Sequence, residues 1–421
     1  MSQKGQAAWA AKLGLAALLL AAPGLAGAAP ASAAQPAAGE AFQLVALGDS
    51  ITAGFEPKVD YAKELPYGYA DRLYEQSLLH GRASLSNYGI VGLKTEGLKA
   101  FAQAVAAGQA IAGEAIQAGL PDYRADEFGR KAAGIRAELA GADAVAVTIG
   151  GNDVSSLLND AASMTDEALS AKVAELLAQY NANVTAALDA LLTVNPSLRV
   201  FIADQYQPVP MLGGKDLYAK LNQATAAFTA NLDQLAAGYK AKGSNVTAVH
   251  VADDFAGREG MLTHMVSARD FHPTQAGYGV IAAEFGRAVW GSYAELTAPE
   301  AGAPMSIYVS GKALNTPYKP VLKQSVNYVA IQDIVNAVGA KTVWDAKTST
   351  AAIKYGSRTV GVKLGSPTVT VDGAAVPVSS PAYMQKVGAE GKTYVPLATV
   401  AQGLGFSVVY SAKLKTVFIN P

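Results

Sequence analysis

Short apolar runs alternate with amphipathic stretches along residues 40–295, and this alternation predicts strands separated by helices. The first run, Phe42–Leu47, is mostly apolar and is followed by a glycine and small polar residues, as expected where a buried strand ends. Four more strands are predicted at 83–88, 144–149, 198–203 and 246–251. Only Thr148 interrupts the apolar character of the third run, which is typical of a central parallel strand.

The stretches between these strands carry helical patterns and no strong alternation of period two. Helices are expected at about 69–79, 98–118, 130–139, 214–241 and 274–290, with one or two helices across 165–193. Strands that alternate with helices favour a doubly wound, flavodoxin-like α/β fold, with a five-stranded parallel sheet covered by helices on both faces.

The C-terminal part of the chain contains an internal repeat. Residues 296–304 carry Thr, Pro and Gly and predict a linker between a domain at 40–295 and a second domain at 305–421. Within the second domain, Tyr328–Ile331 recurs as Tyr394–Leu397, an offset of 66 residues that Trp344–Lys347 and Tyr410–Lys413 share. Each copy predicts a short helix, a strand, a turn and a strand. We therefore expect a small duplicated α+β domain in which each half covers the other's apolar face.

The N-terminus has the pattern of a secretory signal peptide. Lys4 and Lys12 precede the apolar stretch Leu13–Ala22, and small residues follow at 26–28 and 31–33. This pattern predicts a signal peptide over residues 1–34, hence a secreted protein with no membrane span after cleavage. An uncleaved N-terminal anchor is the alternative. Because the chain has no cysteine, secretion fits a bacterial exported protein better than a eukaryotic one.

Charge is balanced overall but unevenly distributed. The 421 residues carry a net charge of −1 and are 51% hydrophobic, which allows sizeable cores and gives no case for nucleic acid binding. Residues 301–421 hold 12 basic and 4 acidic residues, whereas residues 1–300 hold 21 and 30. The basic C-terminal part is consistent with attachment to anionic cell-wall polymers, and equally with a solvated basic surface that has no partner.

Ser50 is the candidate nucleophile. It follows the first strand, and the carboxyl ends of parallel strands form the edge where ligands bind in such sheets. A serine hydroxyl needs a base within hydrogen-bond reach. Among four histidines, His272 has the best context, because Asp270 precedes it and can fix its tautomer. His264 is the rival base; His80, at a helix end, and His250, in a strand, are weaker. No histidine pair has metal-ligand spacing, so no metal site is expected.

Acyl transfer also needs donors for the developing oxyanion. The Ser50 N–H can serve, and the Gly92 N–H can approach closely because glycine has no Cβ. Asn152 follows a Gly-Gly turn after the third strand and can direct its amide to the same space. Ser50, Gly92 and Asn152 are therefore the expected oxyanion hole.

These residues together resemble the GDSL/SGNH hydrolases over residues 40–295. The matching blocks are Gly48–Thr52, Asn87–Gly92, Gly150–Asp153 and the late Asp-x-His-Pro at 270–273. The resemblance implies Ser50 as nucleophile, His272 as base, and ester hydrolysis through an acyl-enzyme without a cofactor. The family's commoner spacing is Asp-x-x-His, but position 269 is Arg269, so Asp270 takes the role of the acid through a shorter spacing.

Residues 305–421 resemble the copper amine oxidase N-terminal-like domain. The matching features are Ile307–Lys312, the two Tyr-Val-x-Leu/Ile segments and Trp344–Lys347. The family name does not imply chemistry here, because residues 301–421 contain no histidine or cysteine to bind copper. A stalk or attachment module is the expected role.

The sequence thus predicts a secreted serine esterase, carboxylesterase- or lipase-like, acting on a small, lipid or acetylated-carbohydrate ester. The alternative is a cell-wall or glycan-binding protein whose hydrolase fold is inactive. The aromatic loop with Phe55, Tyr61 and Tyr67 and the stretch 98–118 are expected either to wall the substrate pocket or to serve only in packing.

Overall fold

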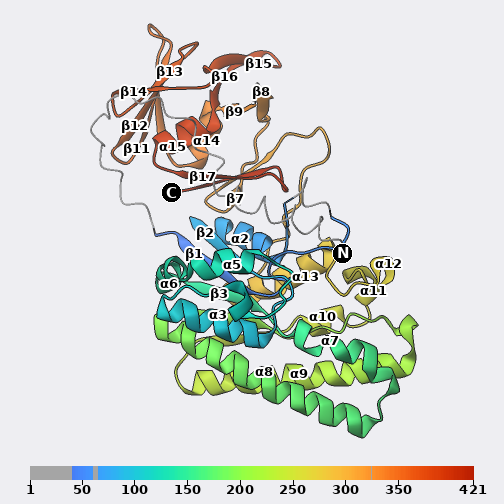
Figure 1. The fold of residues 1–421 in the computed structure, drawn as a ribbon. Coiled ribbons are helices and arrows are strands. Elements are labelled where there is room, and N and C mark those ends of the chain that lie inside the picture. Colours follow the sequence, from blue (N-terminus) through green and yellow to red (C-terminus); the bar gives the residue numbers. More distant parts are fainter. Residues whose placement is uncertain (1–39, 60–64, 324) are drawn as a thin grey trace. The chain divides into compact units, whose positions relative to one another are not determined.

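The computed structural model describes residues 40–59, 65–323 and 325–421. The predicted signal segment and Tyr61 lie outside these described residues. The chain forms two compact units, one from residues 42–74 and 84–294 and the other from residues 75–83 and 295–421 (Figure 1).

The first unit is built on a five-stranded parallel sheet, which confirms the predicted fold class. Its strands are β1 (Phe42–Gly48), β2 (Ala83–Gly89), β3 (Ala144–Thr148), β4 (Arg199–Ala203) and β5 (Val246–Val249). Their order is β2-β1-β3-β4-β5, so the direction of winding reverses between β1 and β3. Open α/β sheets bind ligands at the carboxyl ends of the strands beside such a reversal.

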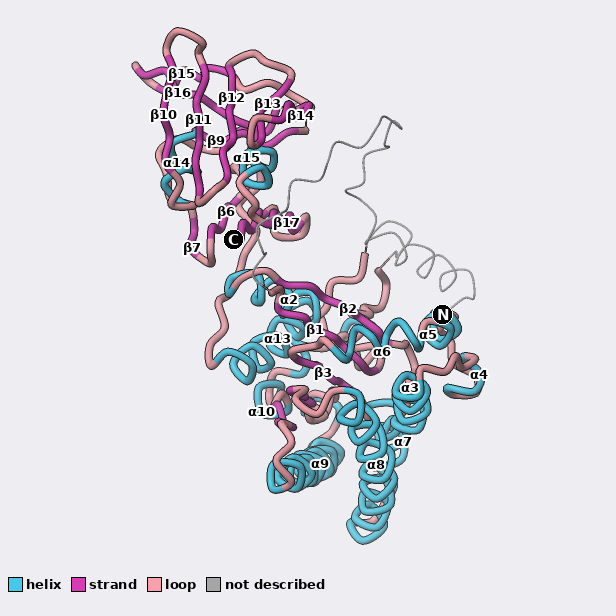
Figure 2. Tube along the Cα trace, turned by 90° about the vertical axis from the view of Figure 1, so that its left-hand side faces the viewer, coloured by secondary structure: helices cyan, strands magenta, loops and turns pink. Residues whose placement is uncertain are grey.

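Helices cover both faces of this sheet, as Figure 2 shows. Val45 and Leu47 of β1 point into the core formed with α3, α6, α8 and α9, whereas Leu44 and Ala46 pack against α2 and α13. Successive side chains of a strand point to opposite faces, so an apolar run is needed when both faces are covered. The helices are α2 (Tyr69–His80), α3 (Thr95–Ala107), α4 (Gly113–Ile116), α5 (Arg124–Arg130), α6 (Ala132–Ala140), α7 (Gly151–Asp160), α8 (Asp166–Val194), α9 (Lys215–Ala241), α10 (Ala252–Phe255), α11 (Glu259–Leu262), α12 (Met265–Ala268) and α13 (Gln275–Trp290).

One expected helix differs from the structure. The single helix predicted across 98–118 is wrong: α3 ends at Ala107, and only the short helix α4 follows. The chain turns at Gly108, which has a φ of +64° and ends α3 in the left-handed conformation that glycine adopts at low cost. The helix predicted at about 130–139 is confirmed as α6, which begins at Ala132 and ends at Ala140.

The second unit is mostly β-sheet, with two short helices. It contains sheets ordered β10-β11-β12-β13-β14, β15-β16-β9-β8 and β17-β18-β6-β7. The elements are β6 (Ser306–Val309), β7 (Lys312–Ala313), β8 (Val321–Lys323), β9 (Val326–Ala330), α14 (Ile331–Ala337), β10 (Lys341–Asp345), β11 (Thr350–Tyr355), β12 (Arg358–Lys363), β13 (Thr368–Val371), β14 (Ala374–Pro377), β15 (Tyr383–Val387), β16 (Glu390–Pro396), α15 (Leu397–Gly403), β17 (Ser407–Ser411) and β18 (Thr416–Asn420).

The repeat seen in the sequence appears as repeated structure. Elements α14, β10 and β11 begin at Ile331, Lys341 and Thr350, and α15, β17 and β18 begin 66 residues later in each case. The strands β9 and β16 that precede the two helices pair antiparallel, with Val329 opposite Val395. Both copies contribute to one core, so each half buries the apolar side of the other.

Within the described ranges, no helix combines the length and the hydropathy that a bilayer span requires.

Candidate active site

Ser50 lies just beyond the carboxyl end of β1, in a turn that only glycine permits at position 48. Gly48 has a φ of +139°, and a Cβ on it would lie 2.0 Å from the Thr148 carbonyl oxygen. The close approach lets the Asp49 N–H donate to the same oxygen at 3.0 Å. The end of β1 is thereby fixed to the end of β3, and Ser50 is held at the reversal point of the sheet.

His272 lies directly against Ser50. The distance between Ser50 Oγ and His272 Nε2 is 2.8 Å, although the two residues are 222 positions apart in the chain. Both residues are buried, with exposed fractions of 2% and 7%. The loop that carries His272 is fixed on its C-terminal side, where the Thr274 side chain caps α13 by accepting from the Gly277 N–H. The shielded contact is suited to proton transfer from a serine hydroxyl.

Asp270 holds the other side of the imidazole. Its Oδ1 lies 2.6 Å from His272 Nδ1 and also accepts the His272 backbone N–H at 2.9 Å. Partial burial would raise the pKa of the Asp270 carboxyl, but the hydrogen bonds and charge of His272 outweigh burial and keep the pKa below its usual value. An ionised Asp270 accepts the Nδ1 proton, which leaves Nε2 free to accept from Ser50.

Aromatic rings pack around the imidazole. Phe55 meets the His272 ring edge-on at 4.6 Å between centroids, and Phe271 stacks on it at 4.5 Å. The Tyr206 hydroxyl donates to the Phe271 carbonyl at 3.0 Å, which ties this loop to the segment after β4. Of the aromatic residues in the loop after Ser50, Phe55 packs against His272. The Tyr67 ring instead faces the Arg72 guanidinium, 4.7 Å from the ring centroid.

The Ser50 N–H is buried and has no backbone acceptor among the described residues. Buried backbone donors are nearly always paired, so this unpaired donor is suited to an anionic oxygen. The Gly92 N–H also has no backbone acceptor in the described part of the chain, but Gly92 is only half-buried. Gly92 follows β2 and has a φ of +83°, and a Cβ there would lie 2.8 Å from Pro121 Cδ.

Asn152 supplies the third polar group, from the first turn of α7. Its Nδ2 donates to the Leu93 carbonyl at 2.9 Å, which ties the start of α7 to the Gly92 loop. The amide carries a second hydrogen that has no acceptor among the described residues. The next residue, Asp153, accepts the Thr95 N–H at the start of α3 at 3.1 Å.

A buried polar network below Ser50 was not predicted as part of the site. Thr52 Oγ1 lies 2.7 Å from Thr148 Oγ1 and 3.0 Å from the Tyr69 hydroxyl. Asp49 accepts from Thr148 at 3.1 Å and from the Ile51 N–H at 3.0 Å. Burial raises the pKa of the Asp49 carboxyl to about 7 despite these donors. Thr148, the one polar residue of the third apolar run, was the sequence signal for this network.

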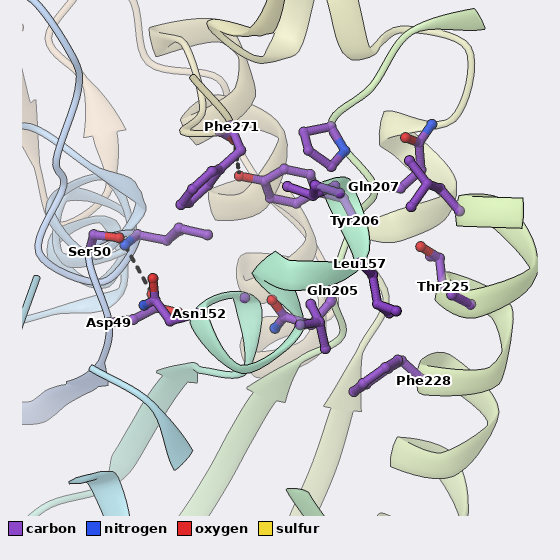
Figure 3. Close-up of a pocket in the computed structure, with 17 residues that line it drawn as sticks. Asp49, Ser50, Asn152, Leu157, Gln205, Tyr206, Gln207, Thr225, Phe228 and Phe271 are labelled. Carbon is purple, nitrogen blue, oxygen red and sulfur yellow. Dashed lines mark hydrogen bonds between the residues drawn. The ribbon is translucent and has the colours of Figure 1, made fainter. Parts of the chain in front are cut away.

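A mostly apolar pocket opens beside Ser50 and Asn152 (Figure 3). Its walls come from α7, the segment after β4 and α9, and of these the sequence had connected only the start of α7, through Asn152, with the site. The apolar lining residues are Ile51, Val154, Leu157, Leu158, Tyr206, Pro208, Leu221, Ala224, Phe228 and Phe271. Neither Phe55, Tyr67 nor any residue of 98–118 lines this pocket.

The other histidines lie in different surroundings. His264 Nε2 is 3.4 Å from Glu56 Oε1, and its Nδ1 is 3.2 Å from the Ser267 hydroxyl. His250 lies 3.4 Å from Asp204. Among the residues that the structure describes, no group of three or more His, Asp or Glu is arranged to hold a metal ion.

The fold and this edge of the sheet define a class of serine-containing α/β hydrolase, and the family comparison agrees. The model of the GDSL-like lipase/acylhydrolase family matches residues 46–280, more than half of the chain, so the protein belongs to this family and is a hydrolase that acts on esters. The copper amine oxidase N-terminal domain model matches residues 308–419. A search of curated proteins finds no match.

Several solved structures share low similarity with the chain. A lipase from a goat rumen metagenome is 19% identical and covers 59% of this chain and 97% of its own, with a TM-score of 0.40. An extracellular lipase from Streptomyces rimosus is 18% identical, covering 60% and 100%, with a TM-score of 0.39. Phospholipase A1 from Streptomyces albidoflavus is 17% identical, covering 57% and 95%, with a TM-score of 0.38.

Proposed function

We propose that the protein is a secreted serine esterase that cleaves carboxylic esters through an acyl-enzyme on Ser50. The observation that carries the proposal is the chain of two short contacts, 2.8 Å from Ser50 Oγ to His272 Nε2 and 2.6 Å from His272 Nδ1 to Asp270 Oδ1. A base oriented by a carboxylate and in contact with a serine hydroxyl is the arrangement that nucleophilic acyl transfer needs.

In the first half-reaction, Ser50 Oγ attacks the ester carbonyl while its proton passes to His272 Nε2. The resulting imidazolium is stabilised by the ionised Asp270. The negative charge on the former carbonyl oxygen is accepted by three donors: the N–H groups of Ser50 and Gly92, and the free hydrogen on Asn152 Nδ2. As the tetrahedral intermediate collapses, His272 gives its proton to the leaving alcohol, and the acyl group stays on Ser50.

In the second half-reaction, water attacks the acyl-enzyme. His272 Nε2 takes a proton from the water as its oxygen bonds to the acyl carbon, and the same three donors accept the oxyanion charge. The intermediate releases the carboxylic acid, and the proton returns from His272 to Ser50 Oγ. Both half-reactions use only groups of this chain and the solvent, and the proposed mechanism includes no cofactor.

The pocket supports an apolar acyl group in the substrate. Leu157 and Phe228 line it together with eight other apolar residues, whereas its polar lining is confined to a few groups such as Gln205 and Thr225. Burial of apolar surface contributes about 25 cal/mol per Å², or about 0.8 kcal/mol for each buried methylene. We therefore propose that esters with a lipid-like or aryl-bearing acyl group bind better than acetyl esters of carbohydrates.

The location of the protein and the role of its second unit are proposals from sequence alone. The pattern at residues 1–34 supports export through a cleaved signal peptide. The excess of basic residues in 301–421 supports retention on anionic cell-wall polymers. If this attachment is electrostatic, the full-length protein should elute from purified cell wall as salt is raised; retention at 1 M salt would exclude it.

Hydrolysis of p-nitrophenyl esters by the wild type and Ser50→Ala tests the proposal. Ser50→Ala should lose about 10⁴-fold or more in kcat because no nucleophile remains. Ser163→Ala, whose hydroxyl is exposed and bonds only locally to the Asp160 carbonyl, should retain full activity. A Ser50→Ala enzyme with near-wild-type turnover would refute the proposed nucleophile.

Hydrolysis of acetyl, butyryl, octanoyl and palmitoyl p-nitrophenyl esters by the wild type then tests the pocket. A preference for the acetyl ester would exclude the pocket as a binding site for an apolar acyl group.

A further inference from the structure

Residues 109–124, which follow α3 and end at the first residue of α5, contact the loop that carries Gly92. The segment is anchored at its own start, where the Gly113 N–H donates to Asp126 Oδ1 at 2.6 Å and the Ile111 N–H donates to the Gly129 carbonyl at 3.2 Å. It contributes no residue to the pocket beside Ser50. Three of its side chains, those of Gln117, Asp122 and Arg124, instead contact residues 89–94, which we call the Gly92 loop.

Gln117 makes two hydrogen bonds to this loop with the two ends of one side-chain amide. Its Nε2 donates to the Gly92 carbonyl at 3.0 Å, and its Oε1 accepts the Lys94 N–H at 2.7 Å. Both bonds join side chain to backbone across more than twenty residues, so they fix the path of the loop and not merely a local turn.

Asp122 holds the loop on the other side of Gly92. Its Oδ2 accepts the Val91 N–H at 2.9 Å. The Arg124 guanidinium pairs with the same carboxylate through two nitrogens, at 2.9 and 2.6 Å, and donates to the Gly89 carbonyl at 3.0 Å. Asp122 and Arg124 are buried, which makes the pair costly to break.

These contacts bracket the one peptide group whose orientation matters for the proposed reaction. The peptide between Val91 and Gly92 carries the Gly92 N–H. Asp122 accepts the Val91 N–H, which belongs to the preceding peptide. Gln117 donates to the Gly92 carbonyl, which belongs to the following peptide. With both neighbouring peptides held, the path of the backbone on either side of this peptide is fixed, which limits the movement of a loop that glycine at position 92, with a φ of +83°, would otherwise make conformationally permissive.

We propose that Gln117 and Asp122 are positioning residues that hold the Gly92 N–H toward the oxyanion. The inference rests on the proposed function, because it assumes that an oxyanion forms beside Ser50. Neither residue touches the substrate. Since a donor stabilises the transition state only when it is already directed at the developing charge, a loosened loop should slow catalysis without weakening ground-state binding.

The test uses Gln117, which is half-buried and can be changed without leaving a buried charge. Gln117→Met keeps the length and bulk of the side chain but removes both hydrogen bonds. Gln117→Glu keeps an acceptor for the Lys94 N–H but removes the donor to Gly92. Gln109→Ala, at an exposed position of the same segment, is the matched control.

Both Gln117 variants should lose about tenfold in kcat, less than the roughly hundredfold or greater loss of a whole oxyanion donor, with KM changed less than twofold. The inhibition constant of phenylboronic acid, which forms a tetrahedral adduct with a serine hydroxyl, should rise by the same factor as kcat falls. Gln109→Ala should match the wild type in all three quantities.

Unchanged kcat in Gln117→Met, or a loss explained entirely by a smaller folded fraction in circular dichroism, would overturn the inference. A fall in kcat with no change in boronic acid affinity would also overturn it, because the oxyanion donor would then be intact. The Ser50→Ala variant separates this result from a failure of the proposed function. If Ser50→Ala is inactive and the Gln117 variants are normal, only the positioning role is wrong.

Discussion

The two units of this protein use their buried residues in opposite ways. In the first unit, polar groups from distant parts of the chain meet at one edge of a parallel sheet, as Ser50 and His272 do across 222 positions. In the second unit, the repeat places equivalent apolar residues in one shared core, and the equivalent tyrosines of β9 and β16, Tyr328 and Tyr394, each donate to a backbone carbonyl.

The difference shows which kind of fold brings catalytic groups together. Parallel strands all end at one edge, so loops of unrelated sequence can bring a nucleophile, a base and oxyanion donors together there. A duplicated unit repeats its core because both halves need the same packing, and this repetition alone builds no such convergence of polar groups. Changes to the polar groups at the sheet edge should therefore lower catalysis, and changes to the shared apolar core of the repeat should lower stability.

After Ser50→Ala, the largest effect is expected at Asp270. Asp270→Asn should lower kcat by about 10²- to 10⁴-fold, because an amide favours the tautomer of His272 that cannot accept the Ser50 proton. Steady-state hydrolysis of a p-nitrophenyl ester measures the effect. Arg269→Asn is the control, since it changes the position where the commoner family spacing would place the acid while tolerating the left-handed φ of +52°. Loss of activity in the control alone would refute the Asp-x-His assignment.

A smaller loss is expected at the oxyanion donor of α7. Asn152→Ala should reduce kcat by about 10²- to 10³-fold and leave KM nearly unchanged, because the amide acts on charge that develops only in the transition state. Asn152→Asp should be at least as impaired, since a carboxylate repels the oxyanion. The account is contradicted if Asn152→Ala raises KM while kcat stays constant.

The second unit should lose stability and not activity when its core is truncated. Ile353 and Ile419 occupy equivalent positions in the two copies, 66 residues apart, and neither is exposed. Replacing either with Ala should lower the free energy of unfolding of that unit by about 2–5 kcal/mol, with similar values for the two sites. Urea unfolding measures the loss, and kcat at 25 °C should not change. Strongly unequal losses would show that the two copies do not share the core equally.

The smallest effect is expected at Asp49. Its folded-state pKa is raised to about 7 from the ordinary value of 3.8, so between these values the folded protein retains a proton that the unfolded chain has released. The free energy of unfolding should therefore fall as pH rises through this window. Asp49→Asn should remove this contribution and raise Tm at pH 8 relative to the wild type by about 2–4 °C, corresponding to about 1 kcal/mol. An equal gain at pH 4 would contradict the cause.

Much of the fold followed from local patterns. All five parallel strands were predicted, and β1, β3 and β4 were visible as apolar runs because both faces of these strands are buried. The strand β2 carries polar residues and is largely half-buried. The offset of 66 residues identified the repeat. The division of the 98–118 stretch was not predicted, because its alanine-rich composition favours helix, although Gly108 is a residue that commonly ends a helix in the left-handed conformation.

The catalytic candidates could be predicted from the sequence, but the pocket could not. Ser50, Gly92, Asn152, Asp270 and His272 lie in motifs, so they could be named in advance. The pocket walls on α7 and α9 are apolar helix residues such as Leu157 and Phe228, and nothing in sequence separates such residues from ordinary core. Likewise, Gln117 is one half-buried glutamine whose two bonds to the Gly92 loop appear only in three dimensions.

The central claim is that Ser50 is the nucleophile, and the most direct measurement is covalent labelling by a fluorophosphonate, which reacts with activated serines. The account predicts that the intact protein gains one adduct, that peptide mass spectrometry places it on Ser50, and that His272→Ala abolishes labelling because Ser50 is no longer activated. An adduct on another residue, or labelling of Ser50→Ala at the wild-type rate, would contradict it.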